Sequence, residues 1–370
     1  MRNNNVLGVI FASVNDDLLS ELTQKRSVAS IPFGGRYRLV DFALSNLVNA
    51  GISKVGLITK SNYQSLMDHI GSGKSWDLDR KNGGLHILPP YGRANAGVYT
   101  GQVDALHGVG HFLRRSTEQY AVLCNSNVAL NIDIADMVEQ HITSGADITL
   151  AYKHGRLPEG NSDVMAFGLN EGRINRVTLY GEKDDCDFGL GIMVISRMLL
   201  IALVEKAAAE NKTDFARDVI MPNLESLIVK GYEHKGFAAV MDSMQNYVNA
   251  NMQLLAPSAR ADLFNSDRPI YTKVKDSMPT RYGVAASVSN SLIADGCVIE
   301  GTVKNSILFR GVHIGKGANI ENCIIMQGTE IGNGANLKYV TIDKGAVVGN
   351  NRELCGAPSY SIYIKKDATV

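Results

Sequence analysis

The sequence has few of the features that mark exported, membrane-bound or nucleic-acid-binding proteins. Its 370 residues include five cysteines, an odd number, with no CxxC pair, which indicates free thiols rather than a disulfide framework or a zinc centre. Lys and Arg (37) balance Asp and Glu (37), so no overall field attracts nucleic acid or an anionic membrane. No apolar run reaches the length of a membrane span. We expect a cytoplasmic protein without a nucleic-acid or membrane partner.

The first 255 residues alternate between strand-like and helix-like segments. Short runs rich in β-branched residues predict buried strands at residues 6–12, 54–59, 120–124, 146–152 and 189–196. Amphipathic or buried helices are predicted at residues 40–51, 134–145, 198–211 and 244–256. This alternation is typical of βαβ units, and therefore of a mostly parallel sheet with helices on both faces. Ligands of such domains bind beyond the carboxyl ends of the strands.

The pattern changes after residue 283, where a repeat of 17 residues begins to show. Aliphatic residues return at fixed offsets, each followed by Gly, as at Ile314, Ile331 and Val348. Such spacing is the signature of a parallel β-helix, in which each coil buries its aliphatic corners against the next coil. We expect an α/β domain at residues 1–255, a connecting segment with three prolines at 256–284 and a β-helix at 285–370.

Several long stretches resemble the glucose-1-phosphate adenylyltransferase family. They are PFGGRYRLVDFALSN, SWDLDRKNGGLHILPPYGR, DFARDVIMP, NANMQLL and DRPIYTKVKDSMPTRY, which begin at residues 32, 75, 214, 249 and 267. The resemblance implies a Rossmann-like nucleotidyltransferase domain followed by a left-handed parallel β-helix. It also implies a reaction in which glucose 1-phosphate attacks the α-phosphorus of ATP and pyrophosphate leaves, with Mg²⁺ and a Gly-rich loop neutralising the phosphates.

The family's phosphate loop resembles L-A-G-G-x-G-T-R-L, and this sequence departs from it. Counting back from the FGG stretch places Ser13, Val14 and Asp16 at the three glycine positions and Leu18 at the arginine position. Side chains at the glycine positions block close backbone approach or the required positive φ, and Asp16 would repel a polyphosphate. We therefore expect a phosphate loop that has lost its function.

The metal carboxylates of the family are also replaced. Asn127 stands where the first Asp is expected, and Val240 stands where the second is expected, with Asp242 two residues further on. An amide brings no charge, and hard divalent cations depend on carboxylate oxygens. Loss of the metal alone predicts a rate lowered by roughly a thousandfold or more. No metal or other cofactor is expected on this chain.

Other positions of the family pattern remain. Asp104, Glu182, Lys183 and Gly189 correspond to positions around the sugar-phosphate pocket, although Gly189 replaces a Ser and the residue after Lys183 is no longer Pro. Lys25 and Arg26 correspond to the Lys-Arg pair that contributes to the effector site of related enzymes. We hypothesise that Lys25 and Arg26 contact an effector, and solvated charges at a helix start remain the alternative.

A chain that keeps the scaffold of the family but has altered residues at the catalytic positions resembles the non-catalytic, GlgD-type subunits of this family. That resemblance implies a regulatory chain in glycogen synthesis that forms a heterotetramer with a catalytic subunit, which would use the Mg²⁺. A sugar-phosphate effector and self-association in the absence of the partner are further expectations.

Two alternatives stay open from the sequence. The chain is an active adenylyltransferase if Asp242 or Asp104 supplies the metal carboxylate. It is a β-helix acyltransferase if His313 acts as a base, although Glu330 and Val347 occupy the same place in the next two repeats.

Overall fold

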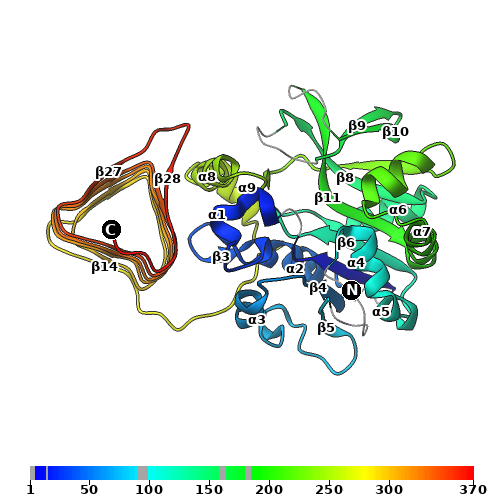
Figure 1. Cartoon of the computed structure of the whole chain (residues 1–370), viewed down its shortest axis with the longest axis horizontal. Helices are drawn as coiled ribbons and strands as arrows, with labels where there is room; N and C mark the ends of the chain where they lie inside the picture. The colour runs from blue at the N-terminus through cyan, green and yellow to red at the C-terminus, as the bar shows by residue number, and fades with distance from the viewer. Residues whose placement is uncertain (1–4, 14–15, 91–98, 158–163, 180–184) are drawn as a thin grey trace.

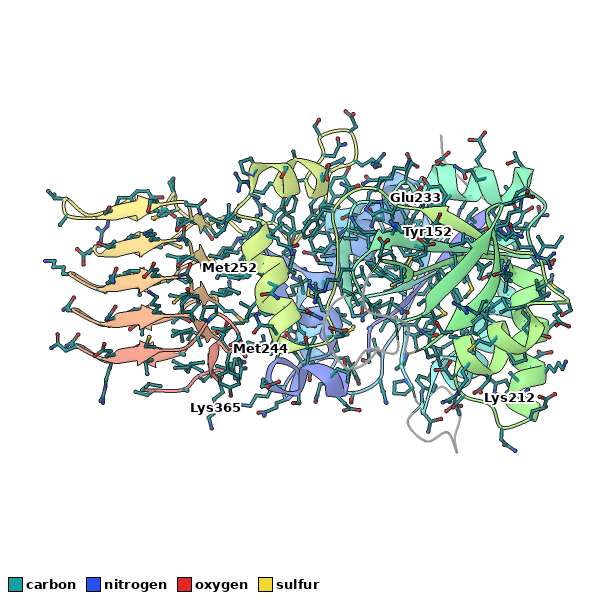
Figure 2. The ribbon with its side chains drawn as sticks, turned by 90° about the horizontal axis from the view of Figure 1, so that it is seen from above. Tyr152, Lys212, Glu233, Met244, Met252 and Lys365 are labelled. Carbon is teal, nitrogen blue, oxygen red and sulfur yellow. The ribbon has the colours of Figure 1, made fainter. Side chains whose placement is uncertain are left out.

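The computed structural model describes residues 5–13, 16–90, 99–157, 164–179 and 185–370. An α/β domain and a triangular β-helix lie side by side, with helix α8 (Met244–Gln253) between them (Figures 1 and 2). No helix in the described part of the chain is long and apolar enough to cross a membrane.

A nine-stranded sheet forms the centre of the α/β domain. Strands β5, β4, β1 and β6 run parallel, β11 runs antiparallel to both β6 and β8, and β12 runs parallel to β8. The order across the sheet is β5 (Gly84–Leu88), β4 (Lys54–Ile58), β1 (Val6–Phe11), β6 (Tyr120–Asn125), β11 (Cys186–Ser196), β8 (Ile148–Gly155), β12 (Val229–Glu233), β10 (Arg173–Thr178) and β9 (Ala166–Asn170). Because β1, β4 and β6 are parallel, their carboxyl ends meet at one edge of the sheet.

Helices cover both faces of this sheet and bury two separate apolar clusters. Leu44 and Leu47 of α2 belong to one cluster, and Leu106 of α4 and Leu200 of α7 belong to the other; all four are 0% exposed. The helices besides α8 are α1 (Ser20–Thr23), α2 (Leu39–Asn49), α3 (Gln64–Ile70), α4 (Gln102–Gly108), α5 (Gly110–Arg115), α6 (Ile134–Thr143), α7 (Arg197–Ala209) and α9 (Pro257–Leu263).

The β-helix consists of three parallel sheets of five short strands each. The first sheet is β14 (Arg281–Tyr282), β17 (Val298–Ile299), β20 (His313–Ile314), β23 (Glu330–Ile331) and β26 (Val347–Val348). The second is β15 (Ser287–Ser289), β18 (Thr302–Lys304), β21 (Asn319–Glu321), β24 (Asn336–Lys338) and β27 (Glu353–Cys355). The third is β16 (Leu292–Ile293), β19 (Ile307–Leu308), β22 (Ile324–Ile325), β25 (Val340–Ile342) and β28 (Ile362–Ile364).

The pairing register follows the repeat in the sequence. Ile314 pairs with Ile331, and Ile331 with Val348, so neighbouring coils are offset by 17 residues as predicted. All three side chains are buried in the core of the β-helix. The periodic aliphatic residues therefore stabilise each coil by contact with the coils above and below.

The third sheet of the β-helix packs on the α/β domain through a shared apolar core. Leu22 and Phe33 from the first domain, Tyr247 of α8, and Ile307 and Phe309 from the β-helix belong to one buried cluster. The Tyr247 hydroxyl also donates a hydrogen bond to the Pro32 carbonyl oxygen (2.8 Å). The hairpin of β2 (Pro32–Phe33) and β3 (Tyr37–Arg38) therefore belongs to the domain interface.

A buried ion pair joins the two domains. One guanidinium nitrogen of Arg26 lies 2.8 Å and 2.7 Å from the two carboxylate oxygens of Asp343, and the side chains are 3% and 2% exposed. The Tyr363 hydroxyl donates a third hydrogen bond to the same carboxylate (2.9 Å). Because both charges are removed from water, either one left alone would be strongly destabilising.

We predict that Asp343→Asn lowers the free energy of unfolding by about 3 kcal/mol, because it leaves the buried Arg26 charge uncompensated. Chemical denaturation at neutral pH measures the change. The matched control is Glu205→Gln, which breaks the Arg114–Glu205 pair whose side chains are 46% and 52% exposed, and it should cost less than about 1 kcal/mol. Equal losses in the two variants would contradict the prediction.

Candidate functional site

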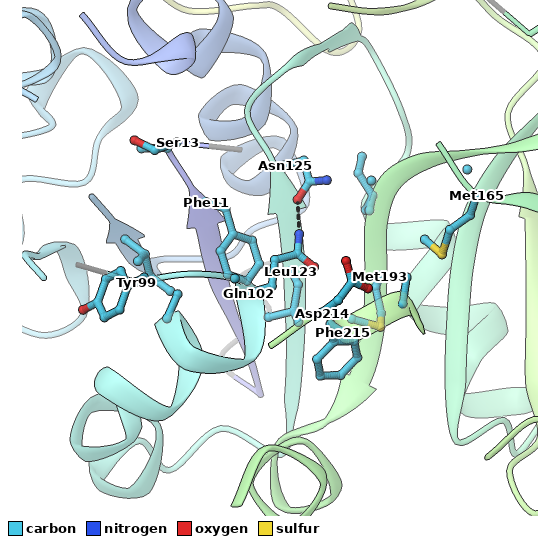
Figure 3. Close-up of a pocket in the computed structure, with 18 of the residues that line it drawn as sticks. Phe11, Ser13, Tyr99, Gln102, Leu123, Asn125, Met165, Met193, Asp214 and Phe215 are labelled. Atoms are coloured by element: carbon cyan, nitrogen blue, oxygen red, sulfur yellow. Dashed lines mark hydrogen bonds between the residues drawn. The ribbon is translucent and has the colours of Figure 1, made fainter. Parts of the chain in front are cut away.

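A cleft of about 380 Å³ opens at the edge of the sheet where β1, β4 and β6 end (Figure 3). Buried apolar side chains make up much of its lining, among them Phe11, Leu123, Phe167, Met193 and Phe215. This is the position that the predicted parallel strands assign to a ligand site.

Asp16 stands at one of the predicted glycine positions of the phosphate loop and lines the cleft. Asp16 begins a short 3-10 turn (Asp16–Leu19), and its carboxylate accepts a hydrogen bond from the Val28 backbone N–H (2.8 Å). Burial raises the pKa of Asp16 above its usual value, while the Val28 N–H opposes that shift. A carboxylate of the chain itself therefore takes up a backbone donor beside the cleft, where a bound phosphate would need such donors free.

The other predicted positions of the phosphate loop differ in whether they line the cleft. Ser13 lines the cleft together with Asp16. Leu18 is half-buried in the 3-10 turn and stands outside the described lining of the cleft. Leu19, which follows it, is fully buried in the core between the domains. Val14 falls outside the described residues.

Both predicted metal positions are buried away from the described lining of the cleft. Asn127 is 4% exposed, and its backbone carbonyl oxygen accepts the Met241 backbone N–H (2.7 Å). Val240 lies in β13 (Ala238–Val240), which pairs with β7 (Val128–Leu130). Asp242, the nearby acid, is 1% exposed and accepts a hydrogen bond from the Asn246 amide. This arrangement does not present a carboxylate pair to the cleft.

Preformed metal clusters are absent from the described residues. No three His, Cys, Asp or Glu side chains there lie together so that they could hold a metal ion.

The predicted sugar-phosphate positions are only partly within the described residues. Gly189 of β11 lines the cleft. Asp104 is half-buried, and its carboxylate accepts the Thr100 backbone N–H (3.1 Å), which holds the start of α4. Glu182 and Lys183 fall outside the described residues. Gly189 is therefore the member of this set that the structure brings to the cleft, while Asp104 contacts its own helix.

Two amide side chains that the sequence reasoning missed meet inside the cleft. The Gln102 amide donates a hydrogen bond to the Asn125 amide oxygen (3.0 Å), and this contact joins α4 to the end of β6 (Figure 3). Gly191, with φ of +65°, leaves space for the Asn125 side chain, because a Cβ at position 191 would lie 2.7 Å from the Asn125 side-chain amide nitrogen. Position at the end of a central strand was the one signal that could have indicated Asn125.

Acidic side chains outnumber basic ones in the described lining of the cleft. The charged residues are Asp16, Asp17 and Asp214 against Lys60. Asp214 belongs to a loop held by Asp218, whose carboxylate accepts the backbone N–H groups of Thr213 (3.1 Å) and Asp214 (2.9 Å). This balance disfavours a polyphosphate, which in active phosphoryl-transfer sites meets Arg, Lys or Mg²⁺.

A second hollow, of about 190 Å³, lies between the hairpin of β2 and β3, the connecting segment and the β-helix. We call it the basic pocket, and its cationic residues are Arg36, Arg38, Lys273, Lys275, Arg310 and Lys344. Arg310 is paired with Asp295 (2.9 Å), whereas the side-chain amino groups of Lys275 and Lys344 have no ion-pair partner among the described residues. Burial and the nearby charges of Arg38 and Arg26 lower the pKa of Lys344 to about 6.

The predicted effector residues lie next to this basic pocket but play different parts. Lys25 is exposed and lines a smaller hollow of about 140 Å³, together with Lys365 and Lys366. Arg26 lines the same hollow, but its guanidinium is held by Asp343, which directly precedes Lys344. Both residues of the inter-domain ion pair thus line the smaller hollow, and Lys344, the residue after Asp343, lines the basic pocket.

His313 does not lie in a described pocket. It is exposed on β20, where it pairs with Glu330 of the next coil on the outer face of the β-helix. A base for acyl transfer needs a substrate held against it, and this surface offers none among the described residues.

Comparison with known proteins gives consistent matches over most of the chain. The sequence matches the nucleotidyl transferase family over residues 8–183 and the GlmU-like, C-terminal hexapeptide family over residues 275–357. It is 37% identical to the glycogen biosynthesis protein GlgD of Bacillus subtilis (strain 168), over 87% of this chain and 84% of that protein. The GlgD protein of Geobacillus stearothermophilus is 39% identical, over 85% and 83% of the two chains.

An enzyme is also among the similar proteins. The glucose-1-phosphate adenylyltransferase of Thermosipho melanesiensis is 34% identical, over 86% of this chain and 78% of that protein. Together the matches confirm the predicted fold, a nucleotidyltransferase-like α/β domain followed by a left-handed parallel β-helix.

We predict that Asp16→Asn is more stable than the wild type at pH 7, and that the difference shrinks as the pH falls and disappears below the ordinary Asp pKa of 3.8. A carboxyl whose pKa is raised by folding opposes folding when it is ionised, and this cost vanishes once Asp16 is protonated in both states. Urea unfolding across this pH range measures the difference. Asp17→Asn, the same change at the exposed neighbour, is the control, and a similar pH dependence in both variants would contradict the assignment.

Proposed function

Because the chain belongs to the glucose-1-phosphate adenylyltransferase family, we propose that it is a regulatory subunit in glycogen biosynthesis that does not itself transfer the nucleotidyl group. The single observation that carries this proposal is the state of the cleft. Asp16 takes up a backbone donor beside it, and buried Asn127 and Val240 stand where metal carboxylates are expected.

The reaction of the family places demands that this cleft does not meet. Attack by glucose 1-phosphate on the α-phosphorus of ATP builds negative charge on the transferred group and on the leaving pyrophosphate. Fixed cations, free backbone N–H groups and Mg²⁺ supply most of the stabilisation in such reactions. Lys60 is the one cation in the described lining, against three carboxylates, so the barrier to transfer stays high.

The regulatory half of the proposal rests on the basic pocket. Six basic side chains line it against the one carboxylate of Asp68, and the ammonium group of Lys275 has no ion-pair partner among the described residues. An anionic ligand such as a sugar phosphate would offset this unbalanced charge. It would also bind beside Asp343, whose pairing with Arg26 joins the two domains, so occupancy of the basic pocket can alter how the domains contact each other.

The proposed partner is a catalytic adenylyltransferase subunit, in a cytoplasmic heterotetramer. Cys124, Cys297, Cys323 and Cys355 are free thiols in the structure, which agrees with a reducing compartment. Mg²⁺ and both substrates would bind to the partner, and this chain would change the partner's activity or its response to effectors.

The test of the proposed function is ADP-glucose synthesis from ATP and glucose 1-phosphate in the presence of Mg²⁺. We expect no turnover from the purified chain alone, and a higher rate or a changed effector response when it is co-purified with the catalytic subunit of the same organism. The catalytic subunit alone supplies the reference rate. Turnover by the single chain at an ordinary enzymatic rate would show that another carboxylate supports the metal.

We predict that an anion binding in the basic pocket takes up close to one proton at pH 7. Lys344, with a pKa of about 6, is mostly neutral before binding and becomes charged beside an anion. Affinity should therefore fall as the pH rises from 6 to 8. Calorimetric titration with fructose 1,6-bisphosphate, repeated in buffers of different ionisation enthalpy, measures the proton uptake.

Two variants give this experiment its controls. Lys344→Met removes the titrating amine but keeps a side chain of similar length, and it should abolish the proton uptake. Lys304→Met makes the same change on the exposed face of β18 and should leave the uptake unchanged. Proton uptake that persists in Lys344→Met would assign it to another group.

A further inference from the structure

The lining of the basic pocket includes a histidine that is held by a buried carboxylate. His69 of α3 lines the pocket and is 8% exposed. Its Nε2 lies 2.6 Å from one carboxylate oxygen of Asp41 in α2, and Asp41 is 0% exposed. The other Asp41 oxygen accepts the backbone N–H of Arg38 (2.9 Å). Because each oxygen of Asp41 has a partner, the carboxylate is fixed in position beneath the His69 ring.

This contact determines which ring nitrogen of His69 carries the proton. An ionised carboxylate only accepts hydrogen bonds, so Nε2 is the donor. Burial lowers the pKa of His69 below its usual value, and Arg38 and Lys344 act in the same direction, while Asp41 opposes them. His69 is therefore neutral at pH 7, and its Nδ1 keeps a lone pair that can accept a hydrogen bond.

The Nδ1 atom has no hydrogen-bond partner in the part of the chain that the structure describes. The contacts of the ring there are the Asp41 hydrogen bond and edge-on packing against Trp76, with ring centroids 5.8 Å apart. A buried acceptor without a partner costs free energy. Because His69 lines the basic pocket, a hydrogen-bond donor on a ligand there would satisfy it.

The acceptors and the cations of the basic pocket come from different elements. His69 and the carboxylate of Asp68 belong to α3. The cations come from the β2–β3 hairpin, the connecting segment and the β-helix. An ionised phosphate offers acceptor oxygens only, whereas a hydroxyl group also offers a donor. The lining therefore suits a ligand whose phosphate meets the cations and whose hydroxyl meets α3.

We infer that His69 selects a ligand that carries hydroxyl groups beside its phosphate, and that Asp41 sets the tautomer on which this selection depends. The ligand class is a sugar phosphate, and a phosphate ester without hydroxyls binds less tightly. Asp41 acts through His69 and is a positioning residue. This role rests on the proposed function, because it requires that the basic pocket binds an anion.

Calorimetric titration of two bisphosphates into the full-length chain tests this role. Fructose 1,6-bisphosphate carries hydroxyls, whereas hexane-1,6-diol bisphosphate has two phosphates on the same number of carbons and no hydroxyl. We expect the wild type to bind the sugar bisphosphate more tightly. His69→Phe should weaken that ligand alone by roughly three- to tenfold, the effect of one lost hydrogen bond. His86→Phe makes the same change at an exposed position of β5 outside the described lining and should change neither affinity.

Asp41→Asn separates the effect of the tautomer from that of the ring. The Asn amide oxygen can still accept the Arg38 N–H, but the amide NH₂ donates to Nε2 of His69, so the proton moves to Nδ1. The hydroxyl-free bisphosphate should then gain affinity, and the difference between the two ligands should narrow by about threefold or more. Nitrogen NMR of protein labelled at histidine identifies the protonated nitrogen, with the His69 signal assigned by its absence from His69→Phe.

Three results would overturn the inference. The first is equal affinity of the wild type for the two bisphosphates, a comparison that needs no variant. The second is an equal loss for both ligands in His69→Phe, which would make His69 a general support of the pocket. Either result leaves the proposed regulatory function in place. The third is the absence of binding by both ligands, which would remove the anion site of the proposed function as well.

Discussion

The buried contact between Arg26 and Asp343 is the interaction on which the arrangement of the two domains depends. These residues are 317 positions apart, yet a guanidinium nitrogen lies within 2.8 Å of both carboxylate oxygens, beside a buried apolar cluster shared by the two domains. A buried pair of this kind tolerates little displacement, because a shift of either domain would leave an uncompensated charge. It also fixes where the basic pocket can form, since Lys344 is bonded to Asp343 in the chain.

The interface and the cleft differ in how they follow the family pattern. The stretches that carry the resemblance contribute heavily to the interface: the hairpin with Gly34 is held by the Asn251 side chain, which accepts the Gly34 N–H (3.0 Å). The positions that depart from the pattern gather at or behind the cleft, as Asp16 and Asn127 do. A chain that keeps its domain contacts while Asp16 holds the Val28 donor beside the cleft is suited to influence a neighbour, which is why we favour a regulatory role.

Features that depend on local sequence could be predicted, whereas contacts between distant parts of the chain could not. The buried positions of Ile314 and Ile331 could be predicted because the 17-residue repeat is local, and each coil packs only on its neighbours. The engagement of Arg26 by Asp343 could not, because nothing local links residues so far apart, and we hypothesised an effector contact instead. Counting back along the chain placed Val240 at a metal position, but only the strand pairing shows that it faces the core.

The proposal that the cleft does not hold a magnesium-bound triphosphate is tested most directly by calorimetric titration of ATP into the chain alone, with and without Mg²⁺. We expect no saturable binding tighter than a Kd of about 1 mM and no effect of the metal, because three carboxylates face one lysine in the described lining and Asp16 holds the Val28 donor. A micromolar Kd that tightens when Mg²⁺ is added would contradict this account of the cleft.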